Sequence, residues 1–190
     1  AVGRTDEGKT VLVSGAVPGD VVNARVKKSK SNYFEAEMIE IVEKSPFRVE
    51  PKCMHFGVCG GCKWQNLSYE KQLEFKQDEV FNHIKRIAGI EDFETLPILG
   101  SEEQYFYRNK MEFSFSNARW LTQYEISSEE NFGNRDALGF HIPGMWSKIL
   151  DLNECFLQEN PSNAMHLAIK KHAVENGLQF FDVRNQEGFL

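Results

Sequence analysis

The sequence predicts an α+β protein in which a small β-barrel is followed by a partial α+β domain with an antiparallel sheet and a cysteine-rich loop. Short strand-like segments joined by glycine-containing turns fill the first fifty residues, and a long helical pattern follows a cluster of three cysteines. Pro51 marks the boundary, because the residue before a proline avoids helical backbone. We therefore place one domain at residues 1–50 and the second at residues 51–190.

The predicted barrel rests on three apolar or alternating segments, at residues 10–13, 21–26 and 34–42. A Pro-Gly-Asp turn at residues 18–20 separates the first two, since proline presets φ and glycine tolerates positive φ. Short strands separated by such turns are typical of small barrels. We expect the barrel to lack most of its first strand.

The second domain contains two predicted helices. The first follows a candidate N-cap at Ser68 and ends at Gly89, with apolar residues at helical spacing in between: Leu73, Val80, Ile84 and Ile87. The second begins at Pro161, after Asn160, and runs to about residue 175. Strands are predicted at residues 110–116, 138–142, 148–152 and 179–183, with Met111, Phe113 and Phe115 on one face of the first.

Composition indicates a soluble protein. The net charge is −6, hydrophobic residues make up 41% and aromatic residues 12%, which is enough for a packed core. No apolar run approaches the roughly 20 residues of a membrane helix, and no signal segment opens the chain. We therefore expect a cytoplasmic protein without membrane contact, and no obligate protein partner is indicated.

The negative net charge argues against nucleic acid as a partner, but one segment differs. Residues 23–33 contain four cations and no acid, and they end in Tyr33, a possible stacking partner for a base: the cations are Arg25, Lys27, Lys28 and Lys30. A local basic strip can bind phosphates even on an acidic chain. The alternative is a solvated edge strand whose lysines prevent aggregation.

Three of the four cysteines lie within ten residues, at Cys53, Cys59 and Cys62. Clustering of this kind in a cytosolic chain indicates a metal site or catalysis more than disulfides, although oxidation could join Cys59 to Cys62. Cys155 is the one remaining cysteine, and it is either an ordinary buried thiol or a fourth ligand. Four thiolates complete either a [4Fe–4S] cluster or a zinc site. The spacing favours a cluster, because zinc ribbons use two tight cysteine pairs and only one is present.

Glycines within the cysteine segment support a tight loop around a metal. Gly57, Gly60 and Gly61 give the backbone freedom to fold closely, and their amides can point at sulfur. The five histidines show no metal-ligand spacing. Phe56 and Trp64 flank the motif, and we expect them to shield the site more than to stack on bases.

The cysteine segment, residues 53–65, resembles the RNA 5-methyluridine methyltransferases of the RumA type. Upstream, residues 17–22 and 45–51 resemble that family's TRAM domain, an OB-like barrel that binds RNA. Downstream, the Tyr-Arg-Asn-Lys stretch at residues 107–110 and the Cys-x-x-Gln stretch at residues 155–158 resemble its central domain. The resemblance covers essentially the whole chain.

The resemblance implies that Cys155 is the fourth ligand and that the metal centre is a [4Fe–4S] cluster. It implies S-adenosylmethionine as methyl donor and ribosomal RNA, 23S in particular, as substrate. Strand geometry would put Arg108 and Lys110 on one face, where they are either further RNA contacts or part of a solvated sheet face. In such enzymes a cysteine attacks uridine C6, C5 takes the methyl group, and a carboxylate removes the C5 proton. Transfer-RNA enzymes of the family tend to lack the TRAM domain and the cluster cysteines, which favours ribosomal RNA.

The family's catalytic domain follows the central domain, and none of its residues can be placed in this sequence. All four cysteines are already assigned as ligands, and no glycine-rich nucleotide loop follows a predicted strand. We therefore expect an N-terminal fragment with no catalytic residue and no S-adenosylmethionine site, inactive by itself. Two alternatives are a zinc-stabilised RNA-binding module and a tRNA uridine-5-methyltransferase of the same family.

Overall fold

The computed structural model describes residues 1–128 and 132–190, which divide into two compact units. The units interleave along the chain, because the cysteine loop and the helix that follows it belong to different units. Unit one comprises residues 1–51 and 64–100, and unit two comprises residues 52–63 and 101–190. No helix in these described residues is long and apolar enough to cross a membrane.

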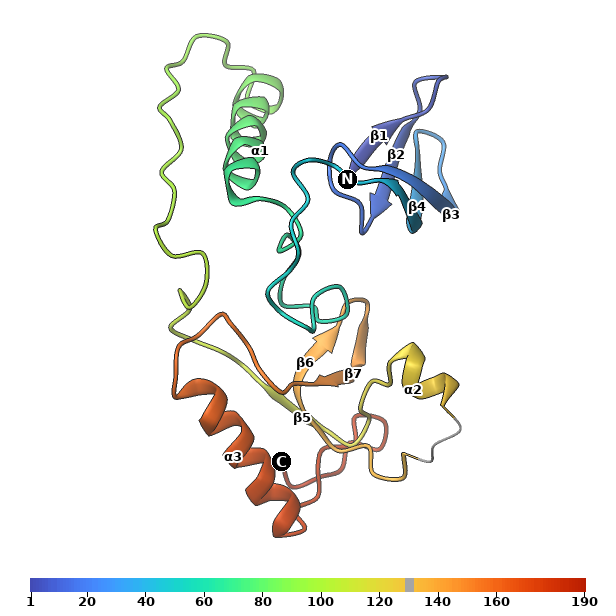
Figure 1. Cartoon of the computed structure of the whole chain (residues 1–190), viewed down its shortest axis with the longest axis vertical. Helices are drawn as coiled ribbons and strands as arrows, with labels where there is room; N and C mark the ends of the chain where they lie inside the picture. Colours follow the sequence, from blue (N-terminus) through green and yellow to red (C-terminus); the bar gives the residue numbers. More distant parts are fainter. Residues whose placement is uncertain (129–131) are drawn as a thin grey trace. The chain divides into compact units, whose positions relative to one another are not determined.

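Unit one contains a four-stranded sheet (Figure 1) built from β1 (Val2–Arg4), β2 (Thr10–Ser14), β3 (Val21–Ser29) and β4 (Tyr33–Glu43). The strand order is β1-β2-β4-β3, with β1–β2 and β3–β4 antiparallel and β2–β4 parallel. The three predicted strands are confirmed, and each is longer than the apolar pattern indicated. The described sheet has β1 and β3 at its edges, so closure into an OB-like barrel stays a prediction.

The turn between β2 and β3 is held by the carboxylate of Asp20, whose side chain is fully buried. It accepts hydrogen bonds from the amides of Val17 (2.7 Å) and Ser45 (2.9 Å), and it forms an ion pair with Arg48. The Ser45 hydroxyl in turn donates to the carbonyl of Pro18 at 2.8 Å. These bonds join the turn to the segment after β4, two stretches that carry the TRAM-like sequence.

Helix α1 (Tyr69–Asn82) follows in unit one and continues as a π-helical turn, η1 (His83–Ile87). The predicted helix is confirmed, and Gly89 follows it with a φ of +69° that favours glycine. Ser68 occupies the N-cap position, but its side chain makes no capping hydrogen bond. The side chain of Gln77 bonds to the backbone of Leu96 and Ile98, which holds the extended segment after η1 along the helix.

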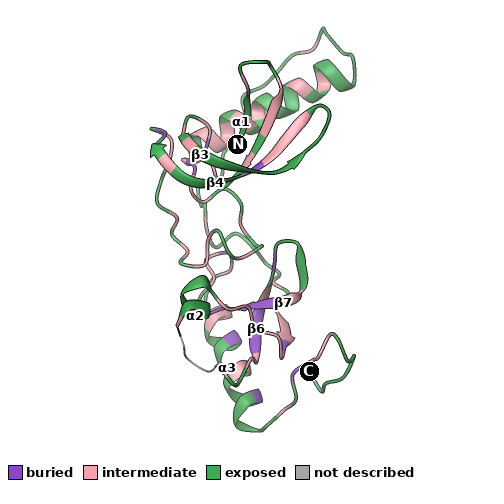
Figure 2. Ribbon diagram, turned by 90° about the vertical axis from the view of Figure 1, so that its right-hand side faces the viewer, coloured by how far each residue is buried: buried purple, intermediate pink, exposed green. Residues whose placement is uncertain are grey.

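Unit two contains a three-stranded antiparallel sheet of β5 (Ser114–Ser116), β6 (Ala137–Ile142) and β7 (Met145–Asp151), in that order. Helices α2 (Gln123–Ser127) and α3 (Ser162–Glu175) belong to the same unit. Buried residues concentrate on β6 and β7 (Figure 2), where Ile142, Leu150 and Leu152 form an apolar cluster.

Helix α3 is attached to this sheet by polar contacts. His166 is buried and its Nε2 lies 2.9 Å from the carbonyl oxygen of Leu138 on β6. Lys170 pairs with Asp151 at the end of β7. The helix begins one residue later than Pro161, and Gly177 follows it at a φ of +61°.

Two predicted strands are wrong in part or in whole. Residues 110–113 are not in a strand, because the chain before them bonds elsewhere: the amides of Phe106 and Arg108 donate to the carbonyls of Phe156 and Leu157 at 2.8 Å. Residues 179–183 form no strand either, although Asp182 makes an isolated bridge with Glu187. At residues 110–113 the alternating pattern reflects burial of one face without ladder hydrogen bonds.

Candidate metal centre and nucleic-acid surface

All four cysteines belong to unit two and are half-buried thiols. Burial raises the pKa of Cys53, Cys59 and Cys155, and negative charge on neighbouring cysteines raises each of these pKa values further. Charge on Cys62 affects all three of the others. Because such coupling requires proximity, the loop and the distant Cys155 are brought to one place.

Backbone amides lie near three of the sulfurs. The amides of His55 and Phe56 act to lower the pKa of Cys53, and that of Leu157 acts to lower the pKa of Cys155. The Gly61 amide donates to the Cys59 sulfur at 3.3 Å. Each of these bonds lowers a thiol pKa and so opposes the effect of burial. Glycine was expected to supply the donors, but most of them come from other residues.

The loop lies against the β6–β7 hairpin so closely that residue 60 has no room for a side chain. A Cβ at Gly60 would stand 2.8 Å from the carbonyl oxygen of His141 and 3.6 Å from the ring of Pro143. Next to it, Cys59 packs against the apolar cluster of β6 and β7. Gly60 is therefore required by close approach to the hairpin.

The segment that carries Cys155 is held by the first turn of α3. The side chain of Asn163 accepts from the Cys155 amide at 2.9 Å and donates to the Cys155 carbonyl at 3.1 Å. The amide of Asn153 donates to Nε2 of His55 in the cysteine loop at 3.3 Å. Sequence patterns do not reveal Asn163, because a side-chain clamp on a distant backbone has no periodic signal.

The donor set fits a metal group that takes four thiolates. Four sulfurs in one neighbourhood, with amide donors aimed at three of them, suit a [4Fe–4S] cluster or a four-cysteine zinc ion. Over the described ranges, no three His, Cys, Asp or Glu side chains are arranged to hold a metal ion as they stand. The four cysteines thus lie in one region, but their sulfurs do not surround a common metal position.

The basic strip lies on β3, where β4 supplies acids that the local sequence does not contain. Lys27 pairs with Glu37 at 2.7 Å and Lys28 pairs with Glu35 at 3.0 Å. A bulge between positions 26 and 28 lets two successive lysines face two acids of the neighbouring strand. These two cations are therefore partly neutralised.

Arg25 and Lys30 differ from the paired lysines. Neither forms an ion pair within 4 Å to any described residue, although Arg25 stands opposite Glu37 in the strand register. Tyr33 begins β4 and is half-buried, and its carbonyl accepts from the Lys30 amide at 2.9 Å. The strip therefore presents its unpaired charge at its two ends.

Arg108 and Lys110 were predicted to share the face of a strand, and that prediction is wrong because residues 108–113 form no strand. Arg108 lines a pocket of about 610 Å³ in unit two, together with Met111, Phe113 and Phe115. Lys110 lies outside that lining, is 80% exposed and pairs with Glu112 at 2.6 Å. The alternation of residues 111, 113 and 115 onto one face is confirmed, since all three line the pocket.

Comparison with known proteins relates this chain to RNA-modifying enzymes. Residues 1–39, which include β1 to β3 and part of β4, match the TRAM domain. An uncharacterized RNA methyltransferase of Bacteroides thetaiotaomicron is 46% identical over 95% of the chain, and one of Chlorobaculum tepidum is 45% identical over 99%. A crystal structure of Pyrococcus abyssi tRNA (uracil-54, C5)-methyltransferase with S-adenosyl-L-homocysteine aligns over 99% of the chain, with a TM-score of 0.56 and 26% identity.

The TRAM match, the RNA methyltransferase relatives and the similarity to a uracil-C5 methyltransferase structure support the RNA 5-methyluridine methyltransferase family for this chain. The chain spans 40% of the length of the Bacteroides member and 39% of the Chlorobaculum and Pyrococcus members. The recognition made from the cysteine and TRAM-like motifs is confirmed at the level of the family.

The TRAM-like segment occurs together with a tRNA substrate in one similar protein. The TRAM-like segment was expected to favour ribosomal RNA, because tRNA enzymes of the family tend to lack it. The Pyrococcus enzyme is named for tRNA, yet its similarity covers 99% of this chain, β1 to β4 included. The segment therefore does not by itself distinguish the two substrates.

Proposed function

We propose that this chain is the RNA-binding and metal-carrying part of an S-adenosylmethionine-dependent enzyme that makes 5-methyluridine in RNA. The observation that carries the proposal is 46% identity over 95% of the chain to an RNA methyltransferase. The matched TRAM domain and the structural similarity to a uracil-C5 methyltransferase support it. The cysteine motif's resemblance to the RumA type favours 23S ribosomal RNA as the substrate.

We propose that Cys53, Cys59, Cys62 and Cys155 hold a [4Fe–4S] cluster. The gathered thiols and the amide donors on three of them support this assignment. When bound, the cluster would supply a four-point attachment between the cysteine loop and the segment after β7. Methyl transfer from S-adenosylmethionine moves no electron, so the role is structural and the site shapes an RNA-facing surface.

The catalytic chemistry is proposed to need residues beyond these 190. The four cysteines serve as ligands, and none is left to attack uridine C6. The isolated chain should therefore incorporate no methyl group into unmodified ribosomal RNA. Incorporation from labelled S-adenosylmethionine by this chain alone would contradict the assignment of all four cysteines.

The RNA function is tested by fluorescence anisotropy with labelled transcripts of 23S ribosomal RNA segments and of tRNA. We expect binding whose affinity falls steeply as salt rises, because phosphate contacts release counterions. Tighter binding to a ribosomal segment supports the 23S proposal, and tighter binding to tRNA supports the tRNA alternative. Absence of binding to either RNA at low salt would overturn the RNA-binding role.

The metal is tested by anaerobic purification followed by iron, sulfide and zinc analysis. A brown protein with absorbance near about 400 nm and about four iron atoms per chain supports the cluster. A colourless protein with one zinc per chain would instead make this a zinc-stabilised module. Reconstitution with iron and sulfide distinguishes a lost cluster from a site that does not take one.

A further inference from the structure

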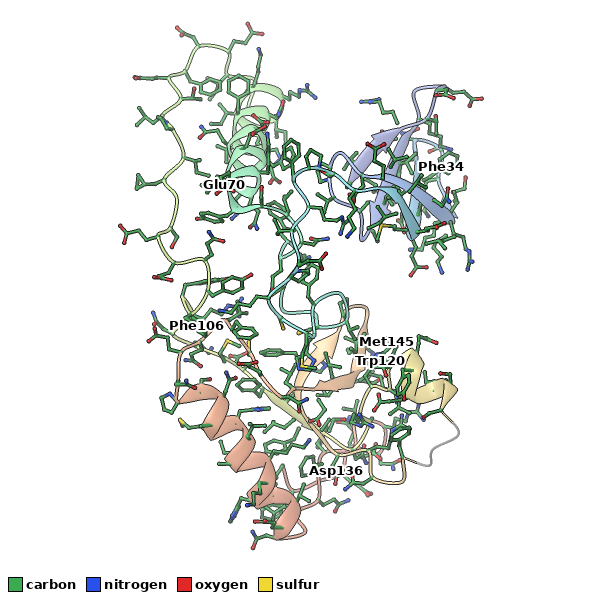
Figure 3. All side chains as sticks on the ribbon, in the orientation of Figure 1. Phe34, Glu70, Phe106, Trp120, Asp136 and Met145 are labelled. Atoms are coloured by element: carbon green, nitrogen blue, oxygen red, sulfur yellow. The ribbon has the colours of Figure 1, made fainter. Side chains whose placement is uncertain are left out.

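A lysine beside the cysteine loop is enclosed by three aromatic rings. The Nζ atom of Lys52 lies 4.9 Å from the ring centre of Tyr105, 4.9 Å from that of Phe106 and 4.7 Å from that of Phe156. All four residues belong to unit two, and Figure 3 labels Phe106. A cation over the face of a ring at this distance is attracted by the ring's quadrupole.

The rings come from the two segments that meet next to the proposed ligands. Lys52 directly precedes Cys53, and Phe156 directly follows Cys155. Tyr105 and Phe106 lie edge-on to Phe156 at 6.4 and 6.1 Å between ring centres. The Phe106 amide also donates to the Phe156 carbonyl at 2.8 Å. The cage therefore ties the backbone of one ligand to that of another far along the chain.

The lysine backbone lies beside the same ring. Burial raises the pKa of Tyr105, and the nearby backbone amide of Lys52 acts in the opposite direction. Within the described residues, Lys52 forms no ion pair with a carboxylate. Its ammonium group therefore contacts the three rings and no described carboxylate.

We infer that Lys52 is a positioning residue for the proposed metal centre: its aromatic cage holds Cys53 in place relative to Cys155 before a metal binds. The inference rests on the proposed metal centre and assigns it a residue that supplies no ligand atom. Without the cage, more of the ordering of these two cysteine segments would have to accompany metal binding. With it, much of that ordering is complete in the folded chain.

The test uses three variants of the anaerobically reconstituted chain. Lys52→Met keeps length and apolar stem but removes the charge, and Lys52→Arg keeps a cation that stacks on rings. Lys63→Met removes a charge from the same loop, next to Cys62 but outside the three-ring cage. The measurement is the rate of iron transfer to a chelator, followed by the loss of cluster absorbance.

We expect Lys52→Met to lose iron about tenfold faster than the parent chain, in the range seen for other residues that orient ligands. Lys52→Arg should restore a rate within about twofold of the parent, and Lys63→Met should leave it unchanged. Equal rates for Lys52→Met and the parent would overturn the inference. Iron loss from Lys52→Arg as fast as from Lys52→Met would also overturn it. Equally fast iron loss from Lys63→Met would do the same, because it would indicate an effect of local charge and not of the cage.

A metal-free measurement separates this inference from the metal proposal. In the apo chain, the amides of Phe106 and Arg108 bond across the cage segments, and Lys52→Met should make their hydrogen exchange about tenfold faster. Failure of the parent chain to take up iron would contradict the metal proposal, while unchanged exchange would contradict the cage. If Lys52→Met does not fold, Phe106→Leu removes one ring and serves in its place, with the same two readouts.

Discussion

At the scale of single residues, the Asp20–Arg48 pair is the clearest case of a motif explained by its contacts. Asp20 has no exposed side-chain surface and Arg48 is 12% exposed. The Arg48 guanidinium, together with the amides of Ser45 and Val17, holds the pKa of Asp20 well below its usual range, against the effect of burial. The TRAM-like residues at these positions therefore support the turn and need not touch RNA.

Asp20→Asn should destabilise unit one by about 3 kcal/mol, because it leaves a buried guanidinium without its counter-charge. Urea unfolding at neutral pH checks this value. The matched control is Lys44→Gln, which breaks the exposed Lys44–Glu50 pair and should cost under about 0.5 kcal/mol. Equal effects of the two variants would contradict the structural role of Asp20.

The same pair predicts sensitivity to acid. Because the pKa of Asp20 is lower in the folded chain than in the unfolded chain, the pair stabilises fully above the ordinary carboxyl pKa of about 3.9. That contribution is lost as pH falls below this value toward the depressed pKa. The loss should be absent from Asp20→Asn, so the stabilities of parent and variant should converge as pH is lowered.

Gly60→Ala should destabilise unit two by about 1–3 kcal/mol, the usual range for overpacking. The added Cβ would meet the His141 carbonyl oxygen at 2.8 Å, and backbone cannot move aside as a flexible side chain can. Gly133→Ala is the matched control, because nothing lies within 4 Å of a Cβ there. Thermal unfolding of both variants, with iron content after reconstitution, checks the prediction.

At the scale of elements, β3 shows how a sheet changes the meaning of a local charge run. Four cations without an acid look like a phosphate-binding strip in the sequence, but β4 supplies Glu35 and Glu37, which form ion pairs with Lys28 and Lys27. Both lysines are more than half exposed, so each pair is screened by solvent and weak. RNA phosphates can therefore compete for them, at the expense of the existing pairs.

Replacing both Arg25 and Lys30 with Gln should weaken RNA binding more than replacing both Lys27 and Lys28. The first two residues form no ion pair within 4 Å of a described acid, whereas the second two are already paired. We expect a loss of about tenfold against about threefold at low salt, with a shallower salt dependence for the first variant. Anisotropy titrations at several salt concentrations measure both, and equal losses would show that the pairs with β4 do not matter.

The elements also show which sequence patterns can be trusted. The helix at α1 and the strands β2, β3, β4, β6 and β7 were predicted, because their periodicity or apolar content extends over most of their length. The predicted strand at residues 110–116 reduces to β5, because its first part bonds to the segment after Cys155. Alternation reports which face is buried, and it does not report which backbone supplies the hydrogen bonds.

At the scale of the whole molecule, each of the two units is built from two stretches that are separated in the sequence. The cysteine loop, residues 52–63, belongs with residues 101–190, while the helix that follows it belongs with the TRAM-like sheet. A group bound by all four cysteines would therefore join two separated stretches of unit two. Its contribution to stability should be confined to that unit.

Cys155→Ser should remove most of the bound iron and loosen unit two alone. Amides of β6 and β7 should exchange about tenfold faster than in the parent, since the cross-link between the loop and the following segment is gone. Amides of β2 and β4 should keep their rates. Hydrogen exchange of both reconstituted proteins measures the two units at once, and equal acceleration in unit one would contradict this confinement.

The sequence alone determined the family, the cysteine set and the order of the main elements, because these depend on local spacing: a Cys-x5-Cys-x2-Cys motif with glycines, an apolar period, a turn. The tertiary structure decided what lies beside each of them. It brought Cys155 to the loop, set acids against the basic strip, separated Arg108 from Lys110 and closed three rings around Lys52. Such contacts join residues far apart in the chain, so no local pattern records them.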